Sequence, residues 1–525
     1  MHRPLWKIAG ESKRTSYLWF FISRNGSGVC SGEGKKGLVV GVYEGCCPGE
    51  FSLTETGRKF NDCVGGKLVE LLKGTRVKKG KAQVFGNLGD EFYHVAAAGL
   101  GPESVGWNSI EAMDECKENI RSAAGVGAMA LQDQGVTNIS VEEFTNAEAA
   151  AEGAALGVWR YQEWKAAEDR ATVAAIDLYG SQEREAWIRG IVKAESQNMA
   201  RELEEVPANL MTPTILCRFM QEHICPCGAK LEVRDRDYLD AQGFSAFLTM
   251  AKGSCEQPAV AEIMYCGASP SDRPIGIIGK AVTFDSGGIN LKDCPMSEHR
   301  GDLAGAAVVI GVMNAICRMR LPLNVVAILP IMENMPSGMA VKPGDVVMAK
   351  NGKTIRIEDT DNEGRVILAD IMTYMEKHHP CLVVNVGTAA QGLKNSVGVP
   401  PTGVFSTSDI VWMEMNRAGG TTGDRVWRFP FWKFYRSRVT NFAGVDTVNK
   451  GKGPGGWPCL GAAFLLEFVP PCIDFVHMDI SASGLLHTGV GMPYLRKNTM
   501  SGRPVRTLVQ FLYQIACPHQ NICDC

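Results

Sequence analysis

Two short acidic stretches, residues 280–302 and 359–365, constrain this chain more than any other feature of its sequence. Both combine charged side chains with glycines, and both lie beside apolar segments typical of buried strands and helices. Four carboxylates and three cations in them are candidates for one site: Asp285, Asp302, Asp361 and Glu363, with Lys280, Lys292 and Arg365. A fold that brings these groups together has a reactive site, and a fold that separates them has two charged loops.

The local patterns around the first stretch predict that its charged groups lie at one edge of a sheet. Residues 274–279 form a short apolar run typical of a buried strand, and Lys280 follows it directly. Residues 303–313 are small and apolar and predict a helix with Asp302 at its amino end, and residues 324–329 predict the next strand. A strand–helix–strand order favours a right-handed crossover and a parallel sheet. Ligands of such sheets bind beyond the carboxyl ends of the strands.

The second stretch is expected at the mouth of a helix. Asn351-Gly352 between two strand-like runs predicts a hairpin with a two-residue turn. The helix predicted from Val366 leaves the three charged residues Asp361, Glu363 and Arg365 at its start.

Four carboxylates in one pocket repel one another unless some take up protons or cations join them. Oxygen ligands suit Zn²⁺, Mn²⁺ or Mg²⁺, and two divalent ions balance four negative charges, as in two-metal hydrolases. The alternative reading of the residues alone is a pair of solvated acidic loops.

Three segments carry a resemblance to a known family. Residues 282–288 read Val-Thr-Phe-Asp-Ser-Gly-Gly, residues 300–307 Arg-Gly-Asp-Leu-Ala-Gly-Ala-Ala, and residues 359–365 Asp-Thr-Asp-Asn-Glu-Gly-Arg. These segments resemble the signature of the leucine (cytosol) aminopeptidases, a family of dinuclear metallopeptidases. Further landmarks in family order extend the resemblance over roughly residues 36 to 515.

The resemblance implies a role for each charged residue. It implies five metal ligands, namely Lys280, Asp285, Asp302, Asp361 and Glu363, with Asp285 and Glu363 shared between two ions. Lys292 would stabilise the developing oxyanion, and Arg365 would hold a bicarbonate ion as proton relay. The metals would activate water and anchor the free α-amine of a peptide substrate. The family pattern also implies a homohexamer.

Several positions depart from the family pattern and predict a remodelled, more polar pocket for the first substrate residue. The interval between Lys292 and Asp302 is one residue shorter than usual. The substrate-binding positions with altered residues or surroundings are Asp359, His299, Thr388, Ala389, Gln391 and Ser481.

The fold class expected is α/β with two domains, the larger one with a mixed, mostly parallel sheet that carries the metal site. The predicted organisation is a basic extension at 1–35, an N-terminal α/β domain at 36–181, a connecting helix at 182–206 and a catalytic domain at 207–525. The extension holds five basic residues against Glu11 before Glu33, which is typical of a mitochondrial presequence. A basic tail on a cytoplasmic protein is the alternative.

Composition excludes several classes of function. A net charge of −3 gives no electrostatic footprint for nucleic acid. No apolar run approaches the roughly 20 residues that span a bilayer, which predicts no membrane partner. The 18 cysteines are scattered in a long chain, which argues against a disulfide scaffold and against a zinc module.

Two functions remain open on these grounds. The first is a two-metal aminopeptidase that removes the N-terminal residue of peptides. The second is a catalytically weak family member that serves as a structural assembly protein. In its many cysteines, its altered pocket and its basic extension, this chain resembles the sperm leucyl aminopeptidases of insects, a branch of the same family.

Overall fold

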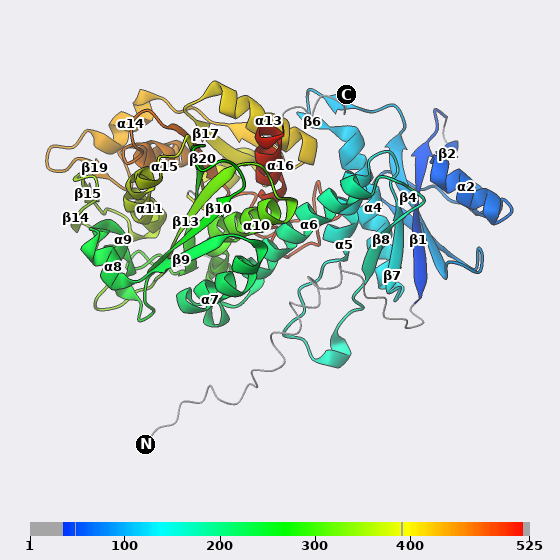
Figure 1. Ribbon diagram of the computed structural model, residues 1–525, viewed down its shortest axis with the longest axis horizontal. Helices are drawn as coiled ribbons and strands as arrows, with labels where there is room; N and C mark the ends of the chain where they lie inside the picture. Colours follow the sequence, from blue (N-terminus) through cyan, green and yellow to red (C-terminus); the bar gives the residue numbers. More distant parts are fainter. Residues whose placement is uncertain (1–34, 48, 294, 390–391, 518–525) are drawn as a thin grey trace, which may run out of the picture.

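A computed structural model describes residues 35–47, 49–293, 295–389 and 392–517. The chain forms two α/β units around two separate sheets, which lie at opposite ends of the long axis in Figure 1. The predicted basic extension lies outside the described residues except for Lys35, and so does Gln391.

The first sheet has six strands in the order β3-β4-β1-β7-β8, with β2 paired to β1. Leu38 and Val40 of β1 face one side and Val39 faces the other, as the period of two in a strand requires. Helices α2 (Glu55–Cys63) and α3 (Lys67–Lys73) cover the first side, and α4 (Glu115–Asp133) and α5 (Ala147–Val158) cover the second. The strands are β1 (Lys36–Glu44), β2 (Phe51–Leu53), β3 (Ala82–Gly86), β4 (His94–Pro102), β7 (Asn138–Glu142) and β8 (Ala175–Tyr179).

The long helix α6 (Arg184–Glu205) connects the two units. It packs on α5 of the first unit and on α10 (Ala304–Met319) of the second. In Figure 1 it runs between the two sheets. Thirteen of its residues are buried, Lys193 and Arg201 among them, because helices from both units cover it.

The second sheet has nine strands in the order β18-β17-β20-β16-β11-β13-β10-β9, with β12 paired to β13. Its centre is parallel: β11 pairs in parallel with both β13 and β16, and β16 with β20. Antiparallel pairs occur at β10 and at β17, so the sheet is mixed and mostly parallel, as predicted. The strands are β9 (Lys230–Arg234), β10 (Ala259–Cys266), β11 (Ile275–Gly279), β12 (Ala281–Asp285), β13 (Asn324–Asn334), β16 (Leu382–Gly387), β17 (Thr402–Ser406), β18 (Val426–Arg428) and β20 (Asp474–Asp479).

Helices cover both faces of this sheet. Ile277 belongs to the core under α6, α10 and α16 (Val505–Ala516), whereas Ile278 belongs to the core under α9 (Ser245–Met250), α11 (Glu363–Tyr374) and α15 (Trp457–Leu466). Two faces of buried apolar residues explain why these central strands read as continuous apolar runs. The remaining helices are α7 (Pro213–His223), α8 (Arg236–Ala241), α12 (Gly392–Val397), α13 (Asp409–Thr422) and α14 (Lys433–Thr440).

Two small sheets complete the fold. A two-stranded one joins β5 (Trp107–Asn108) to β6 (Met113–Asp114), and a three-stranded one has the order β14-β15-β19. The latter contains the expected hairpin of β14 (Val346–Met348) and β15 (Thr354–Arg356), next to β19 (Thr447–Val448).

The turn of this hairpin differs from the two-residue prediction. The Ala349 N–H donates to Lys353 O, and the Gly352 N–H donates to Ala349 O, which leaves three residues in the loop. Gly352 has φ = +84°, the left-handed conformation that closes a three-residue loop. The Asn-Gly pair identified the hairpin but not its loop length.

One helical stretch, Met296–Met319, is long and apolar enough to cross a membrane by length and composition. Its first part, the 3₁₀ turn Met296–Leu303, carries Glu298, Arg300 and Asp302, so the stretch is not one continuous apolar run and does not contradict the sequence expectation. Of its most apolar window, 89% is buried inside the protein, because α10 packs between the sheet and α6. This stretch is a core helix here.

Candidate metal centre

The two acidic stretches meet at the carboxyl edge of the second sheet. β11 and β12 follow one line along β13, and Lys280 interrupts that line between them. The break is held by the backbone, because the Lys280 N–H donates to Val386 O and Lys280 O accepts from the Ala306 N–H. Asp285 ends β12, so both groups lie at the edge where ligands of parallel strands collect.

The other carboxylates reach this edge from the starts of two helices. Asp302 lies in the 3₁₀ turn Met296–Leu303 that leads into α10. Asp361 lies in the turn Thr360–Asn362 directly before α11, and Glu363 is the first residue of that helix. Amino ends of helices stabilise negative charge.

Two lysines lie between the four carboxylates. Lys280 Nζ is 2.7 Å from Asp302 Oδ2 and 2.6 Å from Glu363 Oε1. Lys292 Nζ is 2.8 Å from Asp285 Oδ2 and also contacts Asp361 Oδ1. Oxygens of Asp285, Asp361 and Glu363 all lie within 4.8 Å of one another.

The cluster carries more negative than positive charge. Burial raises the pKa of Asp361 to about 6, and burial with the nearby Asp285 raises the pKa of Glu363 well above its usual value. Burial alone would lower the pKa of Lys280, but the Asp302 and Glu363 carboxylates raise it. Four carboxylates against two ammonium groups leave an excess of two negative charges when all are ionised.

The donor set fits divalent cations. Asp302 Oδ2 and Glu363 Oε1 are buried and receive no hydrogen bond of favourable geometry from the described residues, although Lys280 is within ion-pair distance of both. Buried carboxylate oxygens without donors are the ligands that hard divalent ions take. Lys280 adds an amine that can serve as a ligand once it loses its proton.

Glycines let the cluster close. A Cβ at Gly305 would lie 2.5 Å from Val386 O and 2.8 Å from Lys280 O, so only glycine lets α10 approach the strand break. Gly364 likewise leaves room for the Lys280 side chain, because a Cβ at this position would lie 2.8 Å from Lys280 Cε.

Arg365 is buried at the same edge but does not join the carboxylates through a hydrogen bond. Its Nη1 donates to Asn449 O at 2.6 Å and its Nη2 to Trp457 O at 3.2 Å. Its Nε is buried and has no partner among the described residues. Burial lowers the pKa of Arg365 to about 10. This value is still well above 7, so the guanidinium is charged at neutral pH.

The predicted substrate-binding residues lie around the cluster. Thr388 follows β16, donates its hydroxyl to Asp302 Oδ1 and accepts from Lys280 Nζ at 3.4 Å. The Ala389 N–H and the Ser481 hydroxyl both donate to Asp479 Oδ1, at 3.4 Å and 2.5 Å.

The two other described positions, Asp359 and His299, interact with residues of the candidate site. Asp359 accepts from the Asp361 N–H at 3.1 Å and lies 3.6 Å from Lys450 Nζ. His299 is half-buried, and burial, followed by the charge of Lys292, lowers its pKa.

Two buried polar residues that the sequence analysis did not single out support the site. Asn334, the last residue of β13, donates to Asp285 Oδ1 at 2.8 Å and to Thr360 O at 3.1 Å. Asp479, the last residue of β20, holds the loop after β16. The sequence could have marked both residues only as polar side chains at the ends of apolar strands. That they lie at this edge follows from the order of strands in the sheet.

The fold and site define a two-domain α/β metallopeptidase. The catalytic-domain model of the cytosol aminopeptidase family matches residues 198–509, and the model of that family's N-terminal domain matches residues 39–168. The chain is similar to the cytosol aminopeptidases of Xenopus tropicalis, with 42% identity, and Homo sapiens, with 40% identity. These alignments cover 93% and 92% of this chain and 94% and 93% of the relatives.

Among solved structures, the bottromycin maturation enzyme BotP superposes with a TM-score of 0.78 and 28% identity. The match covers 92% of this chain and 99% of BotP. The chain therefore belongs to the cytosol aminopeptidase family and is a metallo-aminopeptidase of the leucyl aminopeptidase type.

Proposed function

We propose that this protein uses two divalent metal ions per subunit to remove the N-terminal residue of peptides, with a pocket altered from the family pattern. The proposal rests on the convergence of four buried carboxylates around two lysines at one sheet edge. Lys280, Asp285, Asp302, Asp361 and Glu363 would hold the ions. Bound there, the ions would supply Lewis acidity for the scissile carbonyl and would make a water more acidic.

The cations of the chain would act on charge that develops during the reaction. Lys292 is buried beside Asp285, so its ammonium group is held in place to stabilise an oxyanion without reorganisation. The free Nε of Arg365 suits a small anion, and bicarbonate as proton relay is the anion we propose. Asp359 and Thr388 would position the substrate beside these groups.

The choice of metals is proposed as Zn²⁺ or Mn²⁺, with Mg²⁺ also compatible with carboxylate oxygens. A solved structure of BotP is described as a complex with Mn, which supports Mn²⁺ by similarity.

The first-residue pocket is proposed to prefer residues other than leucine. His299 supplies an imidazole whose pKa the charge of Lys292 helps to lower, and Ser481 supplies a hydroxyl bound to Asp479. Polar groups that line a pocket change which side chains bind there, because specificity follows the contacts that the pocket makes with the substrate. A panel of aminoacyl-4-nitroanilides measures this, and a leucine preference equal to that of the relatives would contradict it.

The activity itself is tested with the same panel in the presence of added Mn²⁺ or Zn²⁺. Turnover that a chelator removes and that Asp361→Ala abolishes supports the enzyme. Bound metal without turnover on any amino acid would support the second candidate, a structural assembly protein like the insect sperm leucyl aminopeptidases.

Two further properties belong to this proposal. A homohexamer would cover exposed apolar side chains such as Ile110, which is 93% exposed, and light scattering measures the mass. A mitochondrial location, with the cytoplasm as the alternative, is tested by imaging a C-terminally tagged full chain with and without residues 1–35.

A further inference from the structure

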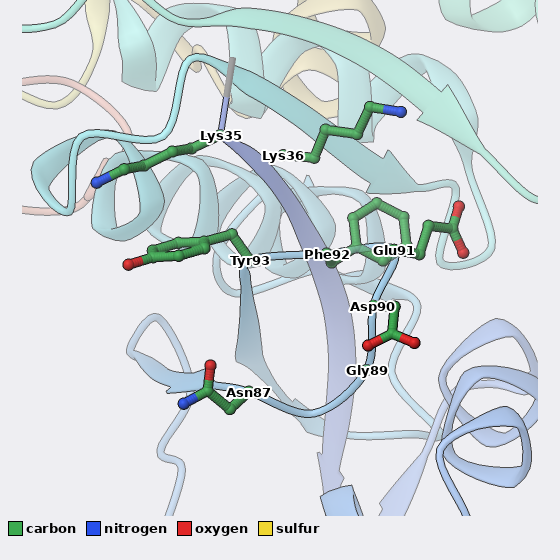
Figure 2. A pocket seen from close by; sticks show the side chains of 8 residues that line it. All are labelled: Lys35, Lys36, Asn87, Gly89, Asp90, Glu91, Phe92 and Tyr93. Atoms are coloured by element: carbon green, nitrogen blue, oxygen red, sulfur yellow. The ribbon is translucent and has the colours of Figure 1, made fainter. Parts of the chain in front are cut away.

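A cavity of about 250 Å³ lies at the junction of the two α/β units and includes none of the candidate metal ligands. Its walls come from β6 and α4 of the first unit and from the segments around residues 399–400, 423–425, 487–492 and 503 of the second. A larger hollow at the start of β1, shown in Figure 2, is open, and its charged residues Lys35, Lys36, Asp90 and Glu91 are exposed. The junction cavity differs because buried polar groups line it.

Two buried side chains of the junction cavity have polar atoms without partners among the described residues. Glu118 is 6% exposed, and its Oε2 accepts from Arg121 Nη1 at 3.1 Å and from the Tyr494 hydroxyl at 3.3 Å, whereas its Oε1 has no donor. His487 is 3% exposed, and neither ring nitrogen makes a hydrogen bond of favourable geometry. A buried polar group left unpaired is costly, so a ligand that supplies the missing partners is favoured.

The imidazole of His487 is neutral at physiological pH. Burial lowers its pKa to about 4, and the charges of Arg503 and Arg201 act in the same direction. A neutral imidazole offers one N–H donor and one bare nitrogen acceptor. The Met492 backbone acts in the opposite direction on this pKa, as a weak partner of the ring N–H. The bare nitrogen of His487 and Glu118 Oε1 are therefore the two acceptors that the cavity lining presents without partners among the described residues.

The rest of the lining divides into apolar walls and two cations. The apolar part comprises Met113, Val399, Pro400, Val490 and Met492. Arg503 is held by Asp424 at 2.5 Å, and Arg425 is bound through Nη1 to Glu111 at 2.6 Å. Both guanidinium groups are thus fixed in place at the cavity.

We propose that this cavity binds a free α-amino acid with an apolar side chain. The ammonium group would donate to Glu118 Oε1 and to the bare nitrogen of His487. The carboxylate would lie near the Arg425 guanidinium, and the side chain would lie against Met113 and Val490. That the ligand is a free α-amino acid rests on the proposed function, which releases free amino acids. Its apolar side chain is inferred from the apolar lining of the cavity.

Binding there would tie the two units together. Glu118 and Met113 belong to the first unit, and the other lining residues belong to the second. A ligand that binds only this folded arrangement raises the melting temperature as its concentration rises above Kd.

The test is calorimetric titration of L-leucine into the full-length Asp361→Ala variant, in which binding at the metal centre is impaired, with chelator present. Saturable one-to-one binding is expected, with a rise in Tm at saturation. N-acetyl-L-leucine, which lacks the ammonium group, and L-leucinamide, which lacks the carboxylate, are each expected to bind at least tenfold more weakly.

Two further substitutions locate the binding. Val490 is 76% exposed, so Val490→Trp fills the cavity mouth without disturbing the core and is expected to raise Kd at least tenfold, whereas Val490→Ala is the matched control and stays within about threefold. Glu118→Gln is expected to weaken binding similarly.

An absence of heat with L-leucine, equal affinity for N-acetyl-L-leucine, or an unchanged Kd in Val490→Trp would overturn the inference. Nitroanilide turnover by the wild-type chain is measured separately. Turnover without L-leucine binding to Asp361→Ala overturns this inference alone, and binding without turnover overturns the proposed function alone.

Discussion

The side chain of Lys280 occupies the space that a Cβ on Gly364 would need: that carbon would lie 2.8 Å from Lys280 Cε and 2.9 Å from its Nζ. The glycine lies between Glu363 and Arg365 at the start of α11, so the helix can approach the lysine closely only without a side chain there. The fit of the candidate metal centre therefore depends on a residue that offers no ligand.

Gly364→Ala is expected to displace the Lys280 amine and to lower kcat/KM at least tenfold, because misplacement of a reacting group by about 1 Å can cost 10²-fold. Titration of the purified variant with Mn²⁺ should show weaker activation as well. The matched control is Gly338→Ala, since a Cβ at Gly338 meets no atom within 4 Å. Equal activity of the two variants would show that Lys280 needs no such space.

Removal of the Thr388 hydroxyl is expected to weaken metal binding. This hydroxyl donates to Asp302 Oδ1, which is buried, and loss of a group that orients a ligand typically costs 10–100-fold in metal affinity or activity. Thr388→Val should therefore need 10–100-fold more metal for half-maximal activity, and Thr388→Ser should restore the wild-type value. A serine variant as weak as the valine variant would assign the effect to packing instead.

Glu142 is expected to make the stability of the first unit depend on pH. It is fully buried, accepts from Thr54 Oγ1 at 2.6 Å, and burial raises its pKa from 4.5 to about 7. A raised folded-state pKa means that its contribution is complete below pH 4.5 and is lost as the pH rises through 7, by roughly 3 kcal/mol at 1.36 kcal/mol per pKa unit.

Thermal melts between pH 5 and pH 8 measure this effect. Glu142→Gln replaces the titratable carboxyl with an amide that is neutral at every pH in this range. The variant should therefore show a smaller decline in Tm toward pH 8 than the wild type. Parallel Tm curves for wild type and variant would contradict the assignment.

Glu152 is expected to hold the two units together. It is 1% exposed, and its Oε2 lies 2.6 Å from Arg121 Nε of its own unit and 2.8 Å from Arg506 Nη1 of the other. Burial alone would raise its pKa, but the charges of Arg121 and Arg506 lower it to about 2. Its stabilising contribution is therefore present above pH 4.5 and is lost as the pH falls through 2.

Glu152→Gln leaves two buried guanidinium groups with less compensation, which should cost about 3–5 kcal/mol in urea unfolding at pH 7. The exposed Glu168→Gln serves as the control and should change stability by less than about 0.5 kcal/mol. A cost below 1 kcal/mol for Glu152→Gln would show that the arginines find other partners.

Much of the candidate site could be predicted because its residues sit at local boundaries. Asp302 precedes an apolar helix and Lys280 follows an apolar strand, and both boundaries are legible from residue type alone. Asn334 and Asp479 also end strands, yet nothing local marks them as neighbours of Asp285 or of the loop at Thr388. Their roles follow from β13 and β20 lying near β11 and β16 in the sheet.

The predicted domain boundaries and the roles of individual site residues stay predictions. The helix predicted at 182–206 appears at Arg184–Glu205, because charged positions on one helix spacing are a strong local signal. The length of the hairpin loop at Gly352 and the 3₁₀ turn Met296–Leu303 before the predicted apolar helix were not foreseen, because both depend on backbone conformation that neighbouring elements select.

The sequence by itself determined the strands, the helices and the acidic stretches, because hydrophobic period, helix-start residues and glycines act within a few residues of one another. Only the tertiary structure decided that Lys280 pairs with Asp302 and Glu363 while Lys292 pairs with Asp285, and that Arg365 binds the backbone of Asn449 instead of the carboxylates. Those choices depend on the order of strands in the sheet and on how closely α10 and α11 approach it. Contacts between residues 22 to 84 positions apart set the strand order and the approach of these helices, and local sequence does not encode such contacts.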